Sequence, residues 1–119
     1  MATSTLYQVE RDGNAAIVTF KNNLTTIADS GQLQDLLQQL SDPGITLVLM
    51  DMSGVEYFGS IMLETFRDAW KCVSSHDGQF ALCSVSEIGR EILNISRFDT
   101  LWPIYPTRAE ALRSLRAGN

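Results

Sequence analysis

Three side chains that could take part in chemistry, Asp51, Ser53 and Ser60, lie within ten positions of one another. Asp51 ends an apolar segment, and α/β folds place their chemistry at the carboxyl ends of such strands. Ser60 begins an amphipathic segment. The start of a helix has unpaired backbone N–H groups and the positive end of the helix dipole, which favour a serine oxygen or an added phosphate. Asp51 and Ser60 are therefore the two candidate phosphate acceptors.

Asp51 is the weaker candidate. A phosphoacceptor aspartate of the response-regulator kind also needs an acidic pair after the first strand to hold magnesium, and a lysine further along the chain. The first two predicted strands offer no such pair. We expect Asp51 instead to accept a hydrogen bond from the backbone of the turn that contains Ser53. Asp51 and Ser53 are thus predicted to shape a turn.

Ser60 has two possible roles, and they are compatible. Its hydroxyl could cap the helix that begins there, which is worth about 1 kcal/mol. It could also accept a phosphate that switches binding to a partner. The sequence leaves both roles open.

Other catalytic arrangements are missing from the sequence. His76 is the only histidine and lies in a polar loop, and no second glycine follows Ser60 as a nucleophile elbow requires. Cys72 and Cys83 lack the spacing of a redox pair or a zinc site. We therefore expect no enzyme, no metal and no cofactor, since a small-molecule enzyme would have only Asp51 and Ser60 in its favour.

The bulk properties predict one domain over residues 1–119. The chain has a net charge of −5 with 45% hydrophobic residues, the balance of a globular protein. Scattered Lys and Arg argue against nucleic acid as a partner. No apolar run approaches the roughly 20 residues of a membrane span, and the first residues lack signal-peptide features. We expect a cytoplasmic protein without membrane insertion, of undetermined oligomeric state.

Hydrophobic periodicity predicts the elements. Strands are expected at 5–10, 14–20, 45–50, 80–85 and 101–105, with a hairpin bend at Arg11–Gly13. Helices are expected after a cap at residues 28–31, at 60–73, after a Ser86 cap, and after a capping box of Thr107 and Glu110. The order β-β-α-β-α-β-α-β-α predicts an α/β fold with a mixed, mostly parallel sheet of about five strands, packed against helices.

The chain resembles the STAS family over nearly its whole length. The resemblance rests on an apolar strand followed by Asp, Ser, Val, an aromatic residue and Ser, and on a closing strand and helix. The matching segments are Leu49-x-Asp51-x-Ser53-x-Val55-x-Tyr57-x-x-Ser60, Val85-Ser86 and Trp102-x-Ile104-Tyr105-x-Thr107-x-x-Glu110-Ala111. This resemblance implies the STAS fold, which is found in bacterial anti-sigma factor antagonists and in sulfate-transporter tails.

The resemblance also implies a function. In antagonists of this family, the serine that matches Ser60 is phosphorylated by a partner that is both a serine kinase and an anti-sigma factor, and the unphosphorylated form binds that partner. Around Ser60, Phe58 and Ile61 are candidate apolar contacts, and Phe58 could equally belong to the core. Glu64 lies one helical turn on from Ser60, so a phosphate would join an acidic patch.

Three residues depart from the family pattern. Gly59 replaces the usual aspartate, Ile61 a common serine or threonine, and Met62 a common glycine. These departures favour an alternative, an interaction subunit without phosphorylation in a signalling assembly or a lipid-transport complex.

Thr25, Thr26 and Asp29 follow the second predicted strand. They could line the same partner surface as Gly59, or they could form a solvated loop and a helix cap. The sequence does not separate these two possibilities.

Overall fold

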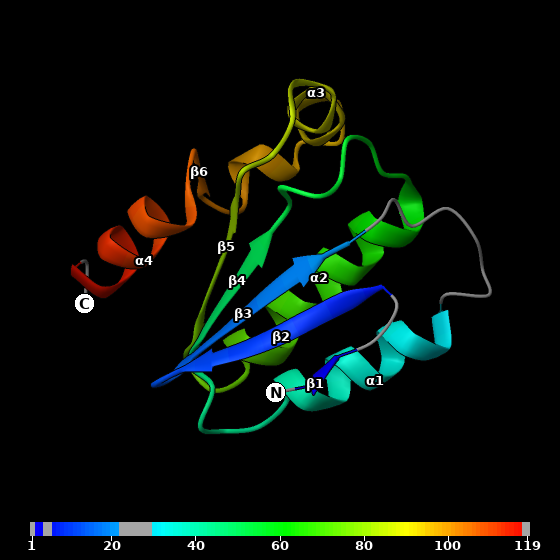
Figure 1. Cartoon of the computed structure of the whole chain (residues 1–119). Coiled ribbons are helices and arrows are strands. Elements are labelled where there is room, and N and C mark those ends of the chain that lie inside the picture. The colour runs from blue at the N-terminus through cyan, green and yellow to red at the C-terminus, as the bar shows by residue number, and fades with distance from the viewer. Residues whose placement is uncertain (1, 4–5, 22–29, 118–119) are drawn as a thin grey trace.

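The computed structural model describes residues 2–3, 6–21 and 30–117, which form one sheet with helices on both faces (Figure 1). The sheet has the order β1-β2-β3-β4-β5-β6, antiparallel from β1 to β3 and parallel from β3 to β6. Its strands are β1 (Ala2–Thr3), β2 (Tyr7–Asp12), β3 (Ala15–Phe20), β4 (Leu47–Asp51), β5 (Gln79–Cys83) and β6 (Ile104–Tyr105). The predicted mixed α/β fold is confirmed, with the two-residue β1 as an additional edge strand.

The helices cover the two faces of the sheet unequally. They are α1 (Ser30–Leu40), α2 (Ser60–Ser74), α3 (Glu87–Ile95) and α4 (Arg108–Ala117), with a short 3-10 turn, η2 (Phe98–Thr100). In Figure 1, α1 and α2 lie on one side of the sheet and α4 on the other, while α3 lies beyond the carboxyl ends of the parallel strands.

Strand β4 occupies the centre of the parallel part, as its uninterrupted apolar run predicts. All five of its residues are buried, and it pairs with β3 on one side and β5 on the other. Such a run is typical of a strand that is covered on both faces.

The hairpin between β2 and β3 bends later than the sequence predicts. Asp12 pairs with Ala15 in the ladder, so the bend lies at Gly13 and Asn14, and Arg11 and Asp12 belong to the strand. Gly13 has a φ of 62°, which glycine adopts readily and which a tight hairpin bend requires. The glycine therefore determines where the strand ends.

A cluster of aromatic rings fills the core under α2. The Phe66 ring lies 5.6 Å from Phe58 and 6.0 Å from Trp102, both edge-on, and the Phe80 and Trp102 centroids are 4.9 Å apart. Edge-to-face pairs at these distances are favourable beyond the area they bury. The cluster joins α2 to β5 and to the segment before β6.

Two helix starts carry the predicted caps. The Ser86 hydroxyl accepts a hydrogen bond from the Gly89 N–H at 2.9 Å, and the Thr107 hydroxyl accepts one from the Glu110 N–H at 3.1 Å. Strand β6 is shorter than predicted, because η2 and its C-cap Leu101 precede it and Trp102 turns into the core. The last predicted strand is therefore real but begins three residues late.

Candidate functional site

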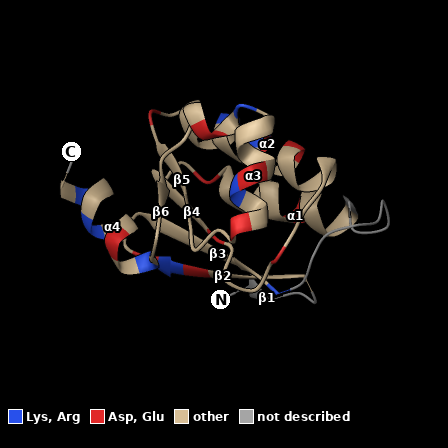
Figure 2. Cartoon of the chain, turned by 90° about the horizontal axis from the view of Figure 1, so that it is seen from above, with Lys and Arg blue, Asp and Glu red and all other residues tan. Residues whose placement is uncertain are grey.

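The candidate site lies at the carboxyl end of the parallel strands. The segment 52–59, which we call the β4–α2 loop, leaves β4 there and leads to the first turn of α2. Figure 2 looks onto this end, and in it the Lys and Arg residues of the described part are spread over several elements instead of forming one patch. A basic nucleic-acid-binding stripe is therefore not seen among these residues.

Ser60 is exposed and is the first residue of α2, but it does not cap the helix. The N-cap residue is Gly59, with extended backbone (φ −118°, ψ −157°), and its carbonyl accepts from the Met62 and Leu63 N–H groups. The prediction that Ser60 is the cap is wrong by one position, because Ser60 already has helical geometry. Its hydroxyl forms no hydrogen bond with any residue that the structure describes. The hydroxyl is therefore available for modification.

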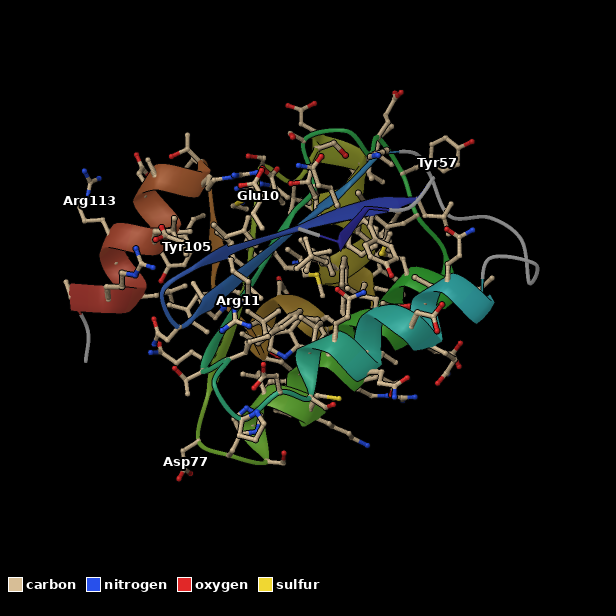
Figure 3. The ribbon with its side chains drawn as sticks, turned by 60° about the horizontal axis from the view of Figure 1, so that its bottom comes forward. Glu10, Arg11, Tyr57, Asp77, Tyr105 and Arg113 are labelled. Carbon is tan, nitrogen blue, oxygen red and sulfur yellow. The ribbon has the colours of Figure 1, made fainter. Side chains whose placement is uncertain are left out.

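Phe58 is a core residue. Its side chain is 4% exposed and packs edge-on against Phe66. Of the two possibilities left open for Phe58, core residue or partner contact, its burial supports the core, where the ring anchors the β4–α2 loop. The adjacent Tyr57 is instead 48% exposed, and Figure 3 shows its ring pointing away from the body of the molecule. The sequence motif contains Tyr57 but does not indicate which of the two aromatic rings faces outward.

Ile61 and Glu64 line a groove between α1 and α2. Ile61 is half-buried and Glu64 is exposed. The groove has a volume of about 220 Å³ and is lined by Leu33, Gln34, Leu37, Ile61, Glu64, Thr65 and Asp68. Glu64 and Asp68 form no ion pair within the described residues. The groove therefore combines apolar side chains with two carboxylates that have no ion-pair partner among the described residues. Glu64 lies one helical turn after Ser60, and Asp68 lies one turn further along α2.

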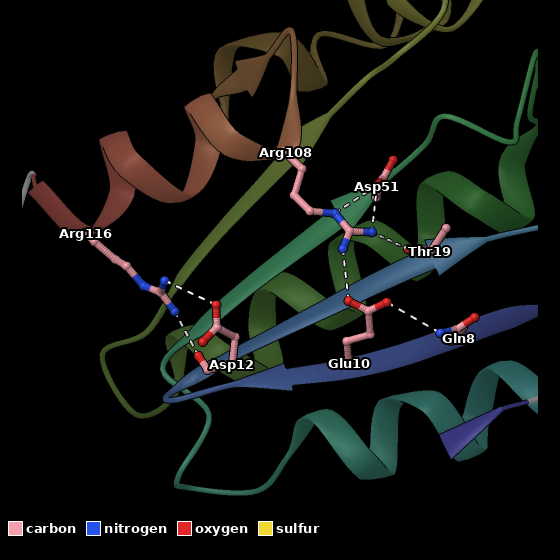
Figure 4. Close-up of polar contacts among 7 residues, drawn as sticks. All are labelled: Gln8, Glu10, Asp12, Thr19, Asp51, Arg108 and Arg116. Atoms are coloured by element: carbon pink, nitrogen blue, oxygen red, sulfur yellow. Dashed lines mark hydrogen bonds and ion pairs between the residues drawn. The ribbon is translucent and has the colours of Figure 1, made fainter. Parts of the chain in front are cut away.

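Asp51 and Ser53 shape the turn after β4. The Ser53 N–H donates to the Asp51 Oδ1 atom at 3.0 Å, which is the predicted turn contact. The other oxygen, Oδ2, accepts from Arg108 Nε at 3.2 Å and Nη2 at 2.9 Å (Figure 4). Asp51 is 6% exposed. A carboxylate so enclosed and already hydrogen-bonded is poorly placed to accept a phosphate.

Arg108 is the residue that sequence reasoning missed. Besides Asp51, its guanidinium donates to Glu10 Oε2 and to the Thr19 hydroxyl, each at 2.9 Å, and the Gln8 amide donates to the other Glu10 oxygen at 3.4 Å. One feature of the sequence could have pointed to Arg108. A positive charge at the first position of a helix is unfavourable because of the helix dipole, so an arginine there suggests that carboxylates elsewhere in the fold compensate it.

Other candidate groups lie outside this site. Thr25, Thr26 and Asp29 lie outside the described residues, so their place stays a prediction. His76 is in the loop between α2 and β5, next to Asp77, which Figure 3 places at the opposite end of the molecule from Tyr57. Its Nε2 atom contacts the Ile45 carbonyl at 2.6 Å. His76 is therefore far from Ser60.

Neither thiol is set up as a nucleophile. Cys72 and Cys83 are both free. Burial and the charge of Asp68 raise the pKa of Cys72, and burial, with a contribution from Asp51, raises the pKa of Cys83 to about 11. Thiols with raised pKa values are largely protonated at neutral pH and react slowly.

Residues 2–3, 6–21 and 30–117 contain neither a metal-binding cluster nor a membrane-spanning helix. No group of three or more His, Cys, Asp or Glu side chains is arranged to hold a metal ion there. No helix in that part of the chain is long and apolar enough to cross a bilayer.

Comparison with known proteins agrees with this fold. The sequence model of one family, described as the STAS domain, matches residues 7–111. The chain therefore belongs to the STAS domain family. One relative comes from Thermotoga neapolitana and is named as the homologue of TM1081, an anti-sigma factor antagonist. It is 32% identical to this chain over 81 residues, which cover 68% of this chain and 72% of the relative.

Solved structures agree as well. The anti-sigma-factor antagonist (STAS) domain protein of Planctomyces limnophilus superposes with a TM-score of 0.80 at 30% identity, over 92% of this chain and 97% of that one. The anti-sigma factor antagonist SpoIIAA in its unphosphorylated form has a TM-score of 0.80 at 14% identity, over 93% and 96% of the chains. The chain thus has the fold of STAS proteins, among them anti-sigma factor antagonists.

Proposed function

We propose that the protein is a regulatory binding module that works by partner switching, with Ser60 as the phosphorylation site. Its partner would be an anti-sigma factor that is also a serine kinase. The observation that carries the proposal is the exposed Ser60 hydroxyl at the first position of α2, which is not used as a cap. SpoIIAA, which shares the fold, has been solved in phosphorylated form, but at 14% identity only the fold is transferred.

The partner surface would extend from Ser60 in two directions along the chain. Gly59 and the exposed Tyr57 ring precede Ser60 in sequence, and Ile61 and Glu64, which line the groove between α1 and α2, follow it. Thr25, Thr26 and Asp29 stay candidates for the same surface. A docked partner would cover Ser60 and remove its surroundings from water.

Phosphorylation would oppose such docking. A phosphate adds about −1.5 to −2 charge at pH 7. A phosphate on Ser60 would lie one helical turn from Glu64. Glu64 forms no ion pair with any described residue, so its negative charge would add to that of the phosphate. Burying that charge in an interface costs desolvation energy, whereas the free protein keeps it in water at the favourable end of the helix dipole. The switch would thus need no change of fold.

The first test is intact mass with phosphosite mapping of the protein purified from its native cells, at rest and under stress. We expect one phosphate on Ser60 whose occupancy changes with condition. A Ser60 that is unmodified under every condition would contradict the switch.

The second test uses two substitutions at Ser60. Because Ser60 is not a cap, Ser60→Ala removes the phosphate acceptor without removing a helix-capping bond. Ser60→Asp adds charge at a position that the helix dipole favours, so both variants should unfold at the same denaturant concentration as the wild type, within error. In pull-downs from native extract we expect an ATPase-kinase partner to bind Ser60→Ala and to be lost from Ser60→Asp.

The matched control is Ser74→Asp. Ser74 is an exposed serine at the other end of the same helix, so this variant adds the same charge away from the candidate surface. It should retain the partner. Loss of the partner from both aspartate variants would indicate a general charge effect and would contradict a role specific to Ser60.

One observation favours a second function, a constitutive interaction subunit. Ile61 contributes apolar surface to the groove directly after Ser60, and apolar surface suits permanent contact. Under this alternative, Ser60 would be unmodified in cells and Ile61→Ala would release the partner while Ser60→Asp would weaken it only slightly.

A further inference from the structure

Arg108 joins three strands to the start of α4. Its guanidinium donates to Glu10 on β2, Thr19 on β3 and Asp51 at the end of β4, all at 2.9 Å in their shortest contacts (Figure 4). The Asp51 contact is made through both Nε and Nη2. Five N–H donors in a fixed plane suit such a set of acceptors, and a lysine could not reproduce the geometry.

The position of Arg108 on its helix needs these acceptors. A positive charge at the first residue of a helix is disfavoured by the dipole. Burial lowers the pKa of Arg108, but the hydrogen bonds and charges of Asp51 and Glu10 outweigh this and raise the pKa overall. The Arg108 side chain is about one third exposed, whereas the Asp51 side chain is almost fully enclosed. The arginine is therefore a lasting cation that compensates an enclosed carboxylate.

The two oxygens of Asp51 face different parts of the molecule. Oδ2 accepts from Arg108, and Oδ1 accepts from the Ser53 N–H in the β4–α2 loop. Next to this contact, the Val55 N–H donates to the Met52 carbonyl at 3.0 Å. The carboxylate thus connects the first residue of α4 directly to the first turn of the loop.

The backbone of the loop is tightly packed at Gly54. A Cβ atom on Gly54 would lie 2.7 Å from the Phe20 carbonyl oxygen, so the backbone is pressed against the end of β3. Further along, the Ser86 hydroxyl contacts the Glu56 carbonyl, and Phe58 enters the core. The path from Asp51 to Ser60 is therefore held at successive points, and the contact between Asp51 and Ser53 is the first of them.

We propose that Arg108 is a positioning residue that couples α4, through Asp51, to the β4–α2 loop and so fixes the approach to Ser60. The coupling itself is a property of the free protein, and its regulatory meaning rests on the proposed function. A contact that shifts the start of α4 would loosen the loop next to the partner surface, although α4 packs on the opposite face of the sheet from α2.

The test is amide hydrogen exchange of the full chain, followed by mass spectrometry with NMR for single residues. In Arg108→Gln we expect exchange at residues 53–56 to be at least about fivefold faster than in the wild type, with the slowest amides of β4 changed by less than twofold. The matched control is Arg116→Gln on the same helix, which removes an exposed pair with Asp12 and should leave residues 53–56 unchanged.

A double-substitution cycle separates coupling from general loosening. Asp51→Asn keeps an acceptor for the Ser53 N–H but removes the charge that holds Arg108. If Arg108 acts through Asp51, the double variant should exchange no faster at residues 53–56 than the faster of the two single variants. If Arg108→Gln does not fold, Arg108→Lys keeps the cation without the planar donor set and should accelerate the same amides.

Three results would overturn the proposal: unchanged exchange at residues 53–56, acceleration equal to that of the slowest β4 amides, or independent effects in the double variant. Failure of the proposed function is a separate result. An unmodified Ser60 together with local acceleration in Arg108→Gln would refute the switch and leave the coupling in place.

Discussion

The two faces of the sheet are stabilised by different kinds of interaction. On the α1/α2 face, a large continuous core contains the aromatic cluster of Phe66, Phe80 and Trp102. On the α4 face, the core is small and is built largely from alanine, leucine and isoleucine, with Cys83 and Ala111 fully buried. At the start of α4, that face carries the polar cluster around Arg108.

This difference indicates a division of roles. Large apolar groups contribute most of the free energy of unfolding and are insensitive to direction. Charged hydrogen bonds contribute less net energy but fix geometry, because they weaken steeply when donor and acceptor are misaligned. The α1/α2 face would therefore supply stability, and the α4 face the position of α4 and of the loop leading to Ser60.

The largest effect is expected from Phe66→Ala. Phe66 is fully buried and contacts Phe58, Phe80 and Trp102, and its truncation leaves a cavity. We expect the free energy of unfolding to fall by about 4 kcal/mol, measured by urea titration. Ile88→Ala, at an exposed site, is the control and should stay within about 0.5 kcal/mol of the wild type.

Leu115→Ala tests the opposite face. Leu115 is 5% exposed and packs in the small core under α4. It lies near the end of the helix, where the chain can relax into the space, so we expect a loss of about 2 kcal/mol. A loss equal to that of Phe66→Ala would show that the two faces contribute equally and would break the comparison.

The thiol of Cys83 should make the α4 face sensitive to alkaline pH. In the folded state the pKa of Cys83 is raised to about 11 from its usual 9.0. Between these values the folded protein holds a proton that the unfolded chain has lost, so stability is complete below pH 9 and falls as pH rises. The expected loss at pH 10 is about 1.4 kcal/mol.

Cys83→Ala provides the matched measurement for this pH effect. Urea titrations of both proteins at pH 8 and pH 10 isolate the thiol, because every other titrating group is shared. The difference in stability between the wild type and the variant should shrink at the higher pH. A constant difference would mean that Cys83 ionises as easily in the folded state as in the unfolded chain.

The smallest effect is expected from Arg116→Ala. Its pair with Asp12 joins two exposed side chains at 3.4 Å, and such surface pairs contribute about 0.5 kcal/mol or less. Thermal unfolding at low and high salt would measure this change. A loss above 1 kcal/mol would show that exposed charges on the α4 face stabilise the fold, in conflict with a mainly geometric role.

Much of the fold follows from local patterns in the sequence. The apolar period predicts a helix over 60–73, and α2 spans Ser60–Ser74. The predicted strand 45–50 is observed as Leu47–Asp51. Caps at Ser86 and Thr107 are also confirmed, since they depend on neighbours three residues away. Boundaries failed where a single backbone angle decides, as at Gly13.

The candidate site was less predictable because it depends on distant contacts. Arg108 lies 57 residues from Asp51 and 98 from Glu10 in sequence, so no short pattern connects them. Phe58 and Tyr57 are neighbours of similar character, and only the path of the loop decides that Phe58 is buried. The predicted helix cap was wrong by one residue, because the N-cap is Gly59 and not Ser60. The spacing of apolar residues along a helix does not locate its first residue so closely.

The outermost strands of the sheet, β1 and β6, have two residues each. Pro103 and Pro106 lie on either side of β6, and proline has no N–H to offer a neighbouring strand. Short edges interrupted by proline give another chain few backbone groups with which to extend the sheet. Among the described residues, the two edges of the sheet thus offer little backbone for strand addition, and the proposed partner surface around Ser60 would act through side chains instead.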